Sequence, residues 1–274
     1  MEPDGPVVVG VDGSKRSQAA AQWAADEAER RHAPLRVLAI NPDPPLTELA
    51  KETADRIAAQ CRDAHPGLEI DASTELGQPA AVLVRGSRTS RLLVVGSRGR
   101  SSLAGVLLGS VSTKVATHAH CPVVVVRDPR TEGPVVVGVD SSPHSGKALE
   151  FAVDSAVIRA ADLVAVQVWH VERASGLSEL DLEAAAQEAA ERSLSEQLAG
   201  RRTNHPDLTV HKVTRHGHPV DQLTEAAREA QLLVVGHRGR GGFPGLLTGS
   251  VAMGVLQHAV CPVAVVRGDD GSRS

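Results

Sequence analysis

The chain has 274 residues and a formal net charge of −4, with 42% apolar and 23% charged residues, as in an ordinary soluble globular protein. This balance argues against nucleic acid as a partner, and no apolar run approaches the roughly 20 residues that cross a bilayer. Three cysteines, an odd number, indicate a reducing compartment rather than a disulfide framework. With no signal-peptide pattern after the acidic N-terminus, we expect a cytoplasmic protein that contacts no membrane.

Apolar runs and Ala-rich stretches alternate along the first half of the chain. They predict strands near 6–12, 35–40, 68–74, 92–96 and 122–127, and helices near 15–31, 46–64, 78–88 and 110–118. The first and fourth strands are continuously apolar, as parallel strands covered on both faces are. Strands alternating with helices predict an α/β fold with a doubly wound parallel sheet.

The second half of the chain repeats this order. Residues 7–12 (VVVGVD) return at 135–140, an offset of 128, and residues 92–96 (LLVVG) return at 232–236, an offset of 140. The second copy therefore carries 12 extra residues, which we place in the acidic stretch around 172–188. A linker rich in Pro, Gly and charge joins the copies near 128–134. We predict two tandem domains, 1–128 and 134–274.

A loop with fixed glycine spacing follows the fourth strand of each copy. Its pattern is Gly-x2-Gly-x9-Gly-Ser, made by Gly96, Ser97, Arg98, Gly99, Gly109 and Ser110, and again by Gly236, His237, Arg238, Gly239, Gly249 and Ser250. Glycines allow the backbone to approach a ligand closely, and a helix that begins at Gly-Ser offers free N–H groups to an anion. Arg98 and Arg238, with Arg100 and Arg240, add positive charge. The loops therefore predict phosphate sites that differ at Ser97 and His237.

An aspartate ends the first strand of each copy, at Asp12 and Asp140. Ligands of doubly wound sheets lie beyond the carboxyl ends of the strands, where the strand order reverses. If the first and fourth strands are neighbours, each aspartate faces the glycine loop and can accept a hydrogen bond from a ribose or help to hold a cation. The alternative is that Asp12 only caps the first helix.

Other chemistries lack their motifs. The chain has no Gly-x4-Gly-Lys-Ser/Thr of a P-loop, no Gly-x-Gly-x-x-Gly after the first strand, and no Gly-x-Ser-x-Gly of a serine hydrolase. His118, His120 and Cys121 could be read as zinc ligands. Val260 stands in the second copy where His120 stands in the first, and a Cys before a buried strand commonly acts as a small hydrophobe. We therefore predict no metal site.

Three patterns together resemble the ATP-binding universal stress proteins, in the tandem form found in actinobacteria. They are the early Val-Gly-Val-Asp-x-Ser, the loop Gly-x2-Gly-x9-Gly-Ser, and the closing His-Ala-x-Cys-Pro-Val, and each occurs twice. The resemblance implies that each domain has a five-stranded parallel sheet, in the order 3-2-1-4-5, flanked by four helices. It also implies one nucleotide site per domain. The implied contacts in the first copy are Gly10, Val11, Asp12, Ile40, Gly96, Ser97, Arg98, Gly99, Gly109, Ser110 and Val111; in the second they are Gly138, Val139, Asp140, Val168, Gly236, His237, Arg238, Gly239, Gly249, Ser250 and Val251.

The expected function is that of a stress-response regulatory protein that binds ATP, alone or with Mg²⁺. The alternatives are a slow ATPase, or a protein that binds cyclic AMP or another adenylate. The loop supplies Gly, Ser and Arg but neither a carboxylate nor a Lys, so we expect no dedicated enzyme and no catalytic residue. Each copy also ends in a bare apolar strand, at 123–126 and 263–266. Such strands need cover, and the resemblance implies that they pair with each other and that two chains form a homodimer. A protein partner is also expected.

Overall fold

The computed structural model describes residues 5–99, 108–170, 179–199, 205–239 and 248–268. Arg100, Arg240 and residues 172–178 of the acidic stretch lie outside these ranges. The chain divides into two compact units. The first comprises residues 1–129 with 262–265, and the second comprises residues 130–261 with 266–274.

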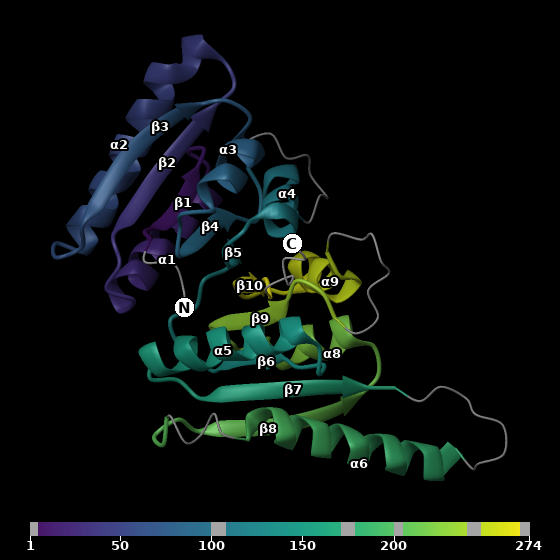
Figure 1. Cartoon of the computed structure of the whole chain (residues 1–274). Helices are drawn as coiled ribbons and strands as arrows, with labels where there is room; N and C mark the ends of the chain where they lie inside the picture. The colour runs from purple at the N-terminus through teal and green to yellow at the C-terminus, as the bar shows by residue number, and fades with distance from the viewer. Residues whose placement is uncertain (1–4, 100–107, 171–178, 200–204, 240–247, 269–274) are drawn as a thin grey trace, which may run out of the picture. The chain divides into compact units, whose positions relative to one another are not determined.

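Strands and helices alternate through the first unit (Figure 1). Its strands lie in the order β3-β2-β1-β4-β5, and all four of these pairings are parallel. The strands are β1 (Val7–Val11), β2 (Leu35–Asn41), β3 (Ile70–Leu76), β4 (Leu92–Gly96) and β5 (Val123–Val126). The helices are α1 (Lys15–Arg30), α2 (Thr47–Ala64), α3 (Pro79–Gly86) and α4 (Ser110–His118), with a 3-10 turn, η1 (Pro44–Leu46), before α2. Within this unit β10 (Val263–Val266) pairs antiparallel with β5, so the last strand of the second repeat covers the bare strand of the first.

The second unit repeats this alternation. Its strands are β6 (Val135–Gly138), β7 (Leu163–Trp169), β8 (Val210–His216) and β9 (Leu232–Gly236), in the order β9-β6-β7-β8. All three pairings are parallel. The helices are α5 (Pro143–Ile158), α6 (Glu179–Leu198), α8 (Pro219–Ala226) and α9 (Ser250–His258). Both units therefore have the predicted doubly wound α/β architecture.

Helices cover both faces of the sheet in the first unit. A Cβ on Gly10 would point at Leu83 of α3, whereas a Cβ on Gly96 would point at the backbone of Arg16 in α1. Gly10 is level with Val95, the neighbour of Gly96, and successive residues of a strand face opposite ways. The helices α1 and α3 therefore lie on opposite faces, with α2 packed beside α1 and α4 beside α3.

The core is aliphatic, as the composition predicts. Val7, Leu35 and Leu92 have no exposed surface. Trp23 is 6% exposed, and Phe151, at the matching place in the second repeat, is 4% exposed, so both rings belong to the core. Burial of each such aliphatic side chain contributes about 1.5–3 kcal/mol, which explains why the unbroken apolar runs form the central strands.

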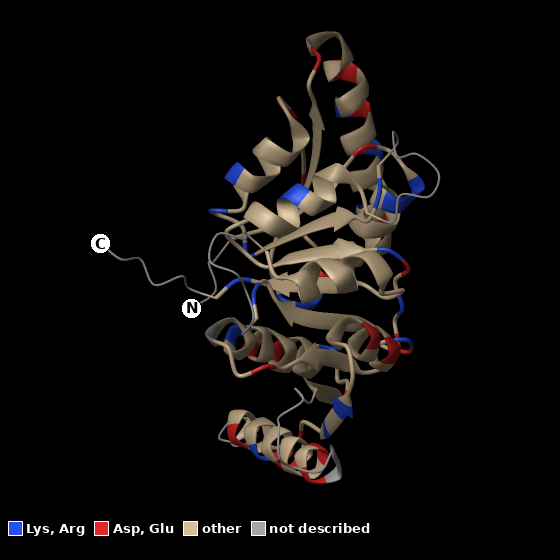
Figure 2. Cartoon of the chain, turned by 90° about the vertical axis from the view of Figure 1, so that its right-hand side faces the viewer, with Lys and Arg blue, Asp and Glu red and all other residues tan. Residues whose placement is uncertain are grey.

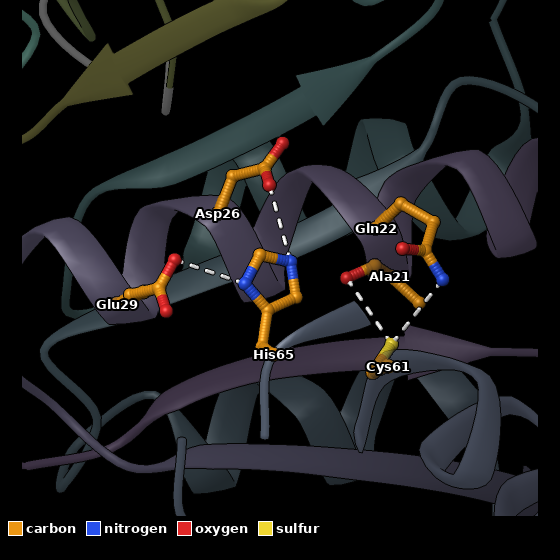
Figure 3. A network of polar contacts seen from close by, with 6 residues as sticks. All are labelled: Ala21, Gln22, Asp26, Glu29, Cys61 and His65. Atoms are coloured by element: carbon orange, nitrogen blue, oxygen red, sulfur yellow. Dashed lines mark hydrogen bonds and ion pairs between the residues drawn. The ribbon is translucent and has the colours of Figure 1, made fainter. Parts of the chain in front are cut away.

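A polar network ties α2 to α1 in the first unit (Figure 3). The His65 ring contacts two carboxylates of α1, with Nε2 3.2 Å from Oδ1 of Asp26 and Nδ1 3.0 Å from Oε2 of Glu29. Both ring nitrogens can donate at once only when the imidazole is protonated. One turn earlier, the Cys61 thiol lies 3.7 Å from the carbonyl oxygen of Ala21. These contacts fix the C-terminal end of α2 against the C-terminal half of α1.

The surface carries charges of both signs (Figure 2), and the cysteines form no disulfide, as their odd number indicated. On the side drawn in Figure 2, blue Lys and Arg residues are interspersed with red Asp and Glu residues. Cys61, Cys121 and Cys261 are all buried and free of disulfides. Within the described ranges, no helix combines the length and the apolar character needed to cross a membrane.

Candidate functional site

The predicted site residues gather where the two central strands of each sheet end. In the first unit β1 and β4 are neighbours, with Gly10 level with Val95, so Asp12 and Ser97 follow adjacent strand ends. In the second unit β6 and β9 are neighbours in the same way, with Val137 level with Val234. The condition for a shared crevice is therefore met in both units.

The aspartate touches the glycine loop in both units. A Cβ built on Gly99 would lie 2.6 Å from Oδ2 of Asp12, and a Cβ on Gly239 would be equally obstructed by Oδ2 of Asp140. Both glycines are exposed, so the backbone at these points faces solvent on one side and a carboxylate on the other. Only glycine allows this approach without displacing the carboxylate.

Asp12 does not cap the first helix, which corrects the alternative interpretation. The N-cap of α1 is Ser14, whose hydroxyl oxygen accepts a hydrogen bond from the Ser17 amide. Asp12 stands two residues before this N-cap, and its Oδ1 accepts from the Ser14 amide at 3.0 Å. In the second unit, Oδ1 of Asp140 likewise accepts from the amide of Ser142, the N-cap of α5. In both aspartates, Oδ1 accepts the backbone hydrogen bond and Oδ2 is the oxygen that faces the glycine loop.

Hydrogen bonds join the two ends of the glycine loop. The Gly109 amide donates to the carbonyl oxygen of Ser97 at 2.8 Å, and the Ser112 hydroxyl donates to the carbonyl oxygen of Gly96 at 2.7 Å. In the second unit the Gly249 amide donates to the carbonyl oxygen of His237 at 2.7 Å. These bonds hold the start of α4 or α9 against the end of the fourth strand of its unit.

The helix that follows each loop begins at a glycine N-cap, which has no side chain to cap the first amides. The N-caps of α4 and α9 are Gly109 and Gly249, and neither helix has an acidic residue in its first turn. No side chain of the described residues caps either end. Ser110 and Ser250, the first helical residues, are exposed. The first N–H groups of a helix have no partner within the helix, so these two ends can accept an anion.

The remaining predicted residues take other places around this edge. Gly10 and Gly138 serve packing, because a Cβ on either would lie 3.0 Å from a leucine of α3 or α8. The side chains of Val11 and Val139 are buried, which leaves only their backbone for a ligand. The other residues are partly exposed at the end of β2 or β7, in the glycine loop, or in the first turn of α4 or α9; they are Ile40, Val168, Arg98, Arg238, Val111 and Val251.

The two loops rest on different side chains. Ser97 is fully buried, and its hydroxyl accepts from Nη1 of Arg16 at 2.9 Å. His237 is 1% exposed, and its ring meets His144 edge-on, with centroids 4.4 Å apart. Arg16 and His144 were not predicted as site residues. They occupy matching places in α1 and α5, at the same offset of 128 as the first strands, and the available signal was that both positions differ between the two repeats.

Two hollows in the second unit lie away from this edge. One, of about 330 Å³, is lined by residues that include Arg130, Arg228 and His258. The other, of about 360 Å³, is lined by residues that include Pro134 and Asp162. Pro134 and Asp162 precede β6 and β7, so the second hollow lies at the edge where strands begin, opposite to the glycine loop. Neither hollow contains a predicted site residue.

Comparison with known proteins agrees with the repeat and the fold. The model of the universal stress protein family matches residues 5–127 and again residues 133–267. A universal stress protein of Mycobacterium bovis is 36% identical to this chain, covering 95% of this chain and 94% of its own length. Another, from Mycobacterium tuberculosis, is 38% identical and covers 95% and 96%. In fold, the chain is similar to a universal stress protein from Archaeoglobus fulgidus, with a TM-score of 0.70 at 21% identity, covering 98% of this chain and 99% of that one. The chain belongs to the universal stress protein family, with two family domains in tandem.

Proposed function

We propose that each domain binds one adenine nucleotide, with ATP as the ligand, at the edge where its central strands end. The observation that carries the proposal is the duplicated contact between an aspartate and an exposed glycine, Asp12 with Gly99 and Asp140 with Gly239, beside an uncapped helix start. Such an arrangement repeated in two domains indicates a ligand site, because a structural turn needs neither the exposed glycine nor the free helix end.

The phosphates are assigned to the glycine loop and the helix that follows it. In the first domain the amides of Ser110 and Val111 open α4, next to the partly exposed Arg98. Amides at a helix start and a guanidinium are suited to a polyphosphate. The second domain offers Ser250, Val251 and Arg238 in the same places. The residues present therefore fit the triphosphate of ATP.

The ribose and the base are assigned to the other side of the same edge. Oδ2 of Asp12 faces the glycine loop, and a carboxylate oxygen there can accept a hydrogen bond from a ribose hydroxyl. Ile40 stands at the end of β2, one strand farther from the loop, and presents a partly exposed apolar surface to the base. Asp140 and Val168 have the same relation in the second domain. A Mg²⁺ ion bound with the nucleotide would lie near the phosphates and these carboxylates.

Binding, rather than catalysis, is the function that the chemistry of the site supports. Gly, Ser and Arg can bind and orient phosphates, but transfer also requires a group that positions the attacking oxygen or removes its proton. The carboxylate nearest the loop, Asp12, already accepts a backbone hydrogen bond through Oδ1. We therefore assign the chain a regulatory role in the stress response, in which the bound nucleotide sets its state for a protein partner, and we expect it to act as a homodimer.

Native mass spectrometry of the purified chain tests the proposal. We expect mass increments of one and two adenine nucleotides per chain, which ATP increases and which Asp12→Asn with Asp140→Asn reduces. Increments of cyclic AMP or another adenylate would redirect the proposal to that ligand. A folded chain that retains no adenine nucleotide, even at millimolar ATP, would contradict it.

A further inference from the structure

A different pair of side chains lies behind the glycine loop of each domain. In the first domain, Nη1 of Arg16 donates to Oγ of Ser97 at 2.9 Å. In the second, the rings of His144 and His237 meet edge-on, with centroids 4.4 Å apart, and His237 is only 1% exposed. A guanidinium keeps its positive charge at every physiological pH, whereas an imidazole titrates close to neutrality. The charge behind the loop is therefore fixed in one domain and titratable in the other.

The backbone of His237 holds the proposed phosphate site in place. Its amide donates to the carbonyl oxygen of Val266 at 2.9 Å, and its carbonyl oxygen accepts from the amide of Gly249, the N-cap of α9, at 2.7 Å. The imidazole is thus carried by the residue that fixes the start of α9. A positive charge attracts a phosphate at short range through the protein interior, and this attraction does not require the ring to face the ligand.

His144 is oriented by the backbone on its other side. Its Nδ1 accepts from the Gly268 amide at 3.2 Å, just after β10. A Cβ on Gly236 would lie 3.1 Å from the carbonyl group of His144, so α5 begins against the residue that precedes His237. Because Nδ1 is an acceptor, the neutral ring of His144 carries its proton on Nε2, and a second proton would break the bond to Gly268. The geometry therefore assigns the titrating proton to His237.

Charged groups of both signs surround this pair in the part of the chain that the structure describes. They are Arg238 in the loop, Asp140 at the end of β6, Arg267 after β10, and Lys147 with Glu150 on α5, which pair at 3.1 Å. Oδ2 of Asp140 faces Gly239, and the first turn of α9 has no acidic residue. The three phosphates of ATP would add more negative charge here than Asp140 supplies. Burial disfavours a charged imidazole, and a nearby anion favours it.

We propose that His237, oriented by His144, is a proton-linked positioning residue of the second nucleotide site, so that this domain takes up a proton when it binds ATP. This inference depends on the proposed function, because it places the phosphates at the start of α9. Bound phosphates favour the charged imidazole, and by linkage the charged imidazole strengthens phosphate binding. Histidine titrates near pH 6.5. The added affinity is therefore present in acid, and it is lost as the pH rises past the point at which the imidazole of the ATP-bound chain loses its proton.

Calorimetry on single-site chains tests this inference. Gly109→Val leaves only the second site, and Gly249→Val leaves only the first. Between pH 8 and pH 6, the ATP affinity of the second site should rise by about tenfold more than that of the first. The first site is the matched control, because it binds the same ligand, and a phosphate monoester itself titrates near pH 6. Titrations in two buffers of different ionisation enthalpy measure proton uptake, which should be larger for the second site.

Exchanging the pairs distinguishes a charge effect from a structural one. His144→Arg with His237→Ser installs the pair that the first domain accommodates behind its own loop. In the chain that keeps only the second site, this exchange should remove the additional pH response and the additional proton uptake while ATP still binds. Arg16→His with Ser97→His should transfer the response to the first site. His258→Gln, at an exposed histidine at the far end of α9, is the control and should leave the response in place.

The possible results separate the inference from the proposed function. Equal pH responses in the two single-site chains, or a response that survives the exchange, would overturn the inference and leave nucleotide binding in place. An exchange that weakens ATP binding equally at both pH values, with proton uptake unchanged, would assign the pair a structural role instead. ATP binding by the first site alone would also overturn the inference. No ATP binding by either site would overturn both.

Discussion

Gly99 and Asp12 approach each other so closely that a methyl group on Gly99 would lie 2.6 Å from Oδ2 of the carboxylate. That contact joins the end of the first strand to the loop after the fourth, two segments far apart in the sequence. No φ in the left-handed region requires glycine at this position. Glycine is needed here because a Cβ would collide with the carboxylate, and this close contact lies at the proposed nucleotide site.

Gly99→Ala is therefore expected to displace the Asp12 carboxylate and to weaken ATP binding to the first domain by about tenfold or more, equivalent to about 1.4 kcal/mol. The measurement is calorimetry on a chain whose second site is blocked by Gly249→Val. Gly86→Ala is the matched control, because a Cβ on Gly86 meets nothing within 4 Å. Unchanged affinity in Gly99→Ala would remove Asp12 from the site.

The contacts of His65 with Asp26 and Glu29 are expected to stabilise the first domain. Replacing His65 by Ala leaves Asp26 and Glu29 without their shared partner, and because both carboxylates are more than a third exposed, each contact contributes about 0.2–1 kcal/mol. Glu29→Val copies the residue that stands at the matching place in the second repeat, Val157, and should cost less. Urea unfolding measures the effect of both substitutions. The unfolding of the first domain is followed through the emission of Trp23 in α1, in chains that also carry Trp169→Phe. Identical curves for His65→Ala and the parent would show that the network contributes nothing.

Cys61 predicts a loss of stability in alkali. Burial, reinforced by the charge of Asp26 and opposed by that of Arg62, raises the pKa of the Cys61 thiol from 9.0 to about 11. The unfolded chain ionises first, so the stabilisation, about 3 kcal/mol, is complete below pH 9 and is lost as the pH rises from 9 to about 11. Unfolding free energies of Cys61→Ala should fall less steeply over this range than those of the parent. Parallel pH profiles would contradict the assignment.

Turnover of ATP is expected to be negligible. The sequence of each glycine loop contains Gly, Ser and Arg, which suit phosphate binding, but no Asp, Glu or Lys that would activate an attacking water. Phosphate release with Mg²⁺ present should therefore stay far below the median enzymatic rate of about 10 s⁻¹. Sustained hydrolysis near that rate, abolished by Asp12→Asn with Asp140→Asn, would instead establish an enzyme.

The fold could be predicted from the sequence because strands and helices are indicated by local patterns of residues. Unbroken apolar runs and Ala-rich stretches locate the strands and helices of the first domain to within two residues of their observed ends. Only the turn at Pro44–Leu46 was missed, because two prolines before a helix predict a loop. A bare run of four apolar residues predicted only that β5 needs cover; that β10 covers it was implied by the family resemblance, and the structure shows this pairing.

The site could be predicted only in part, because its contacts join segments that are distant in the sequence. Glycine spacing located the loop, but the approach of Gly99 to Asp12 depends on which strands are neighbours. The sequence comparison drew attention to His237 yet could not show that its ring is buried against His144.

Calorimetric titration with ATP tests the central claim, one nucleotide site in each domain, most directly. The parent chain should bind about two ATP per chain. Gly109→Val and Gly249→Val should each bind about one, because a branched side chain at either position would meet the backbone of Arg98 or Arg238 and occupy the space in front of the helix start. The doubly substituted chain, shown by circular dichroism to be folded, should bind none. Retention of two sites in that folded chain, or no binding by the parent, would contradict the account.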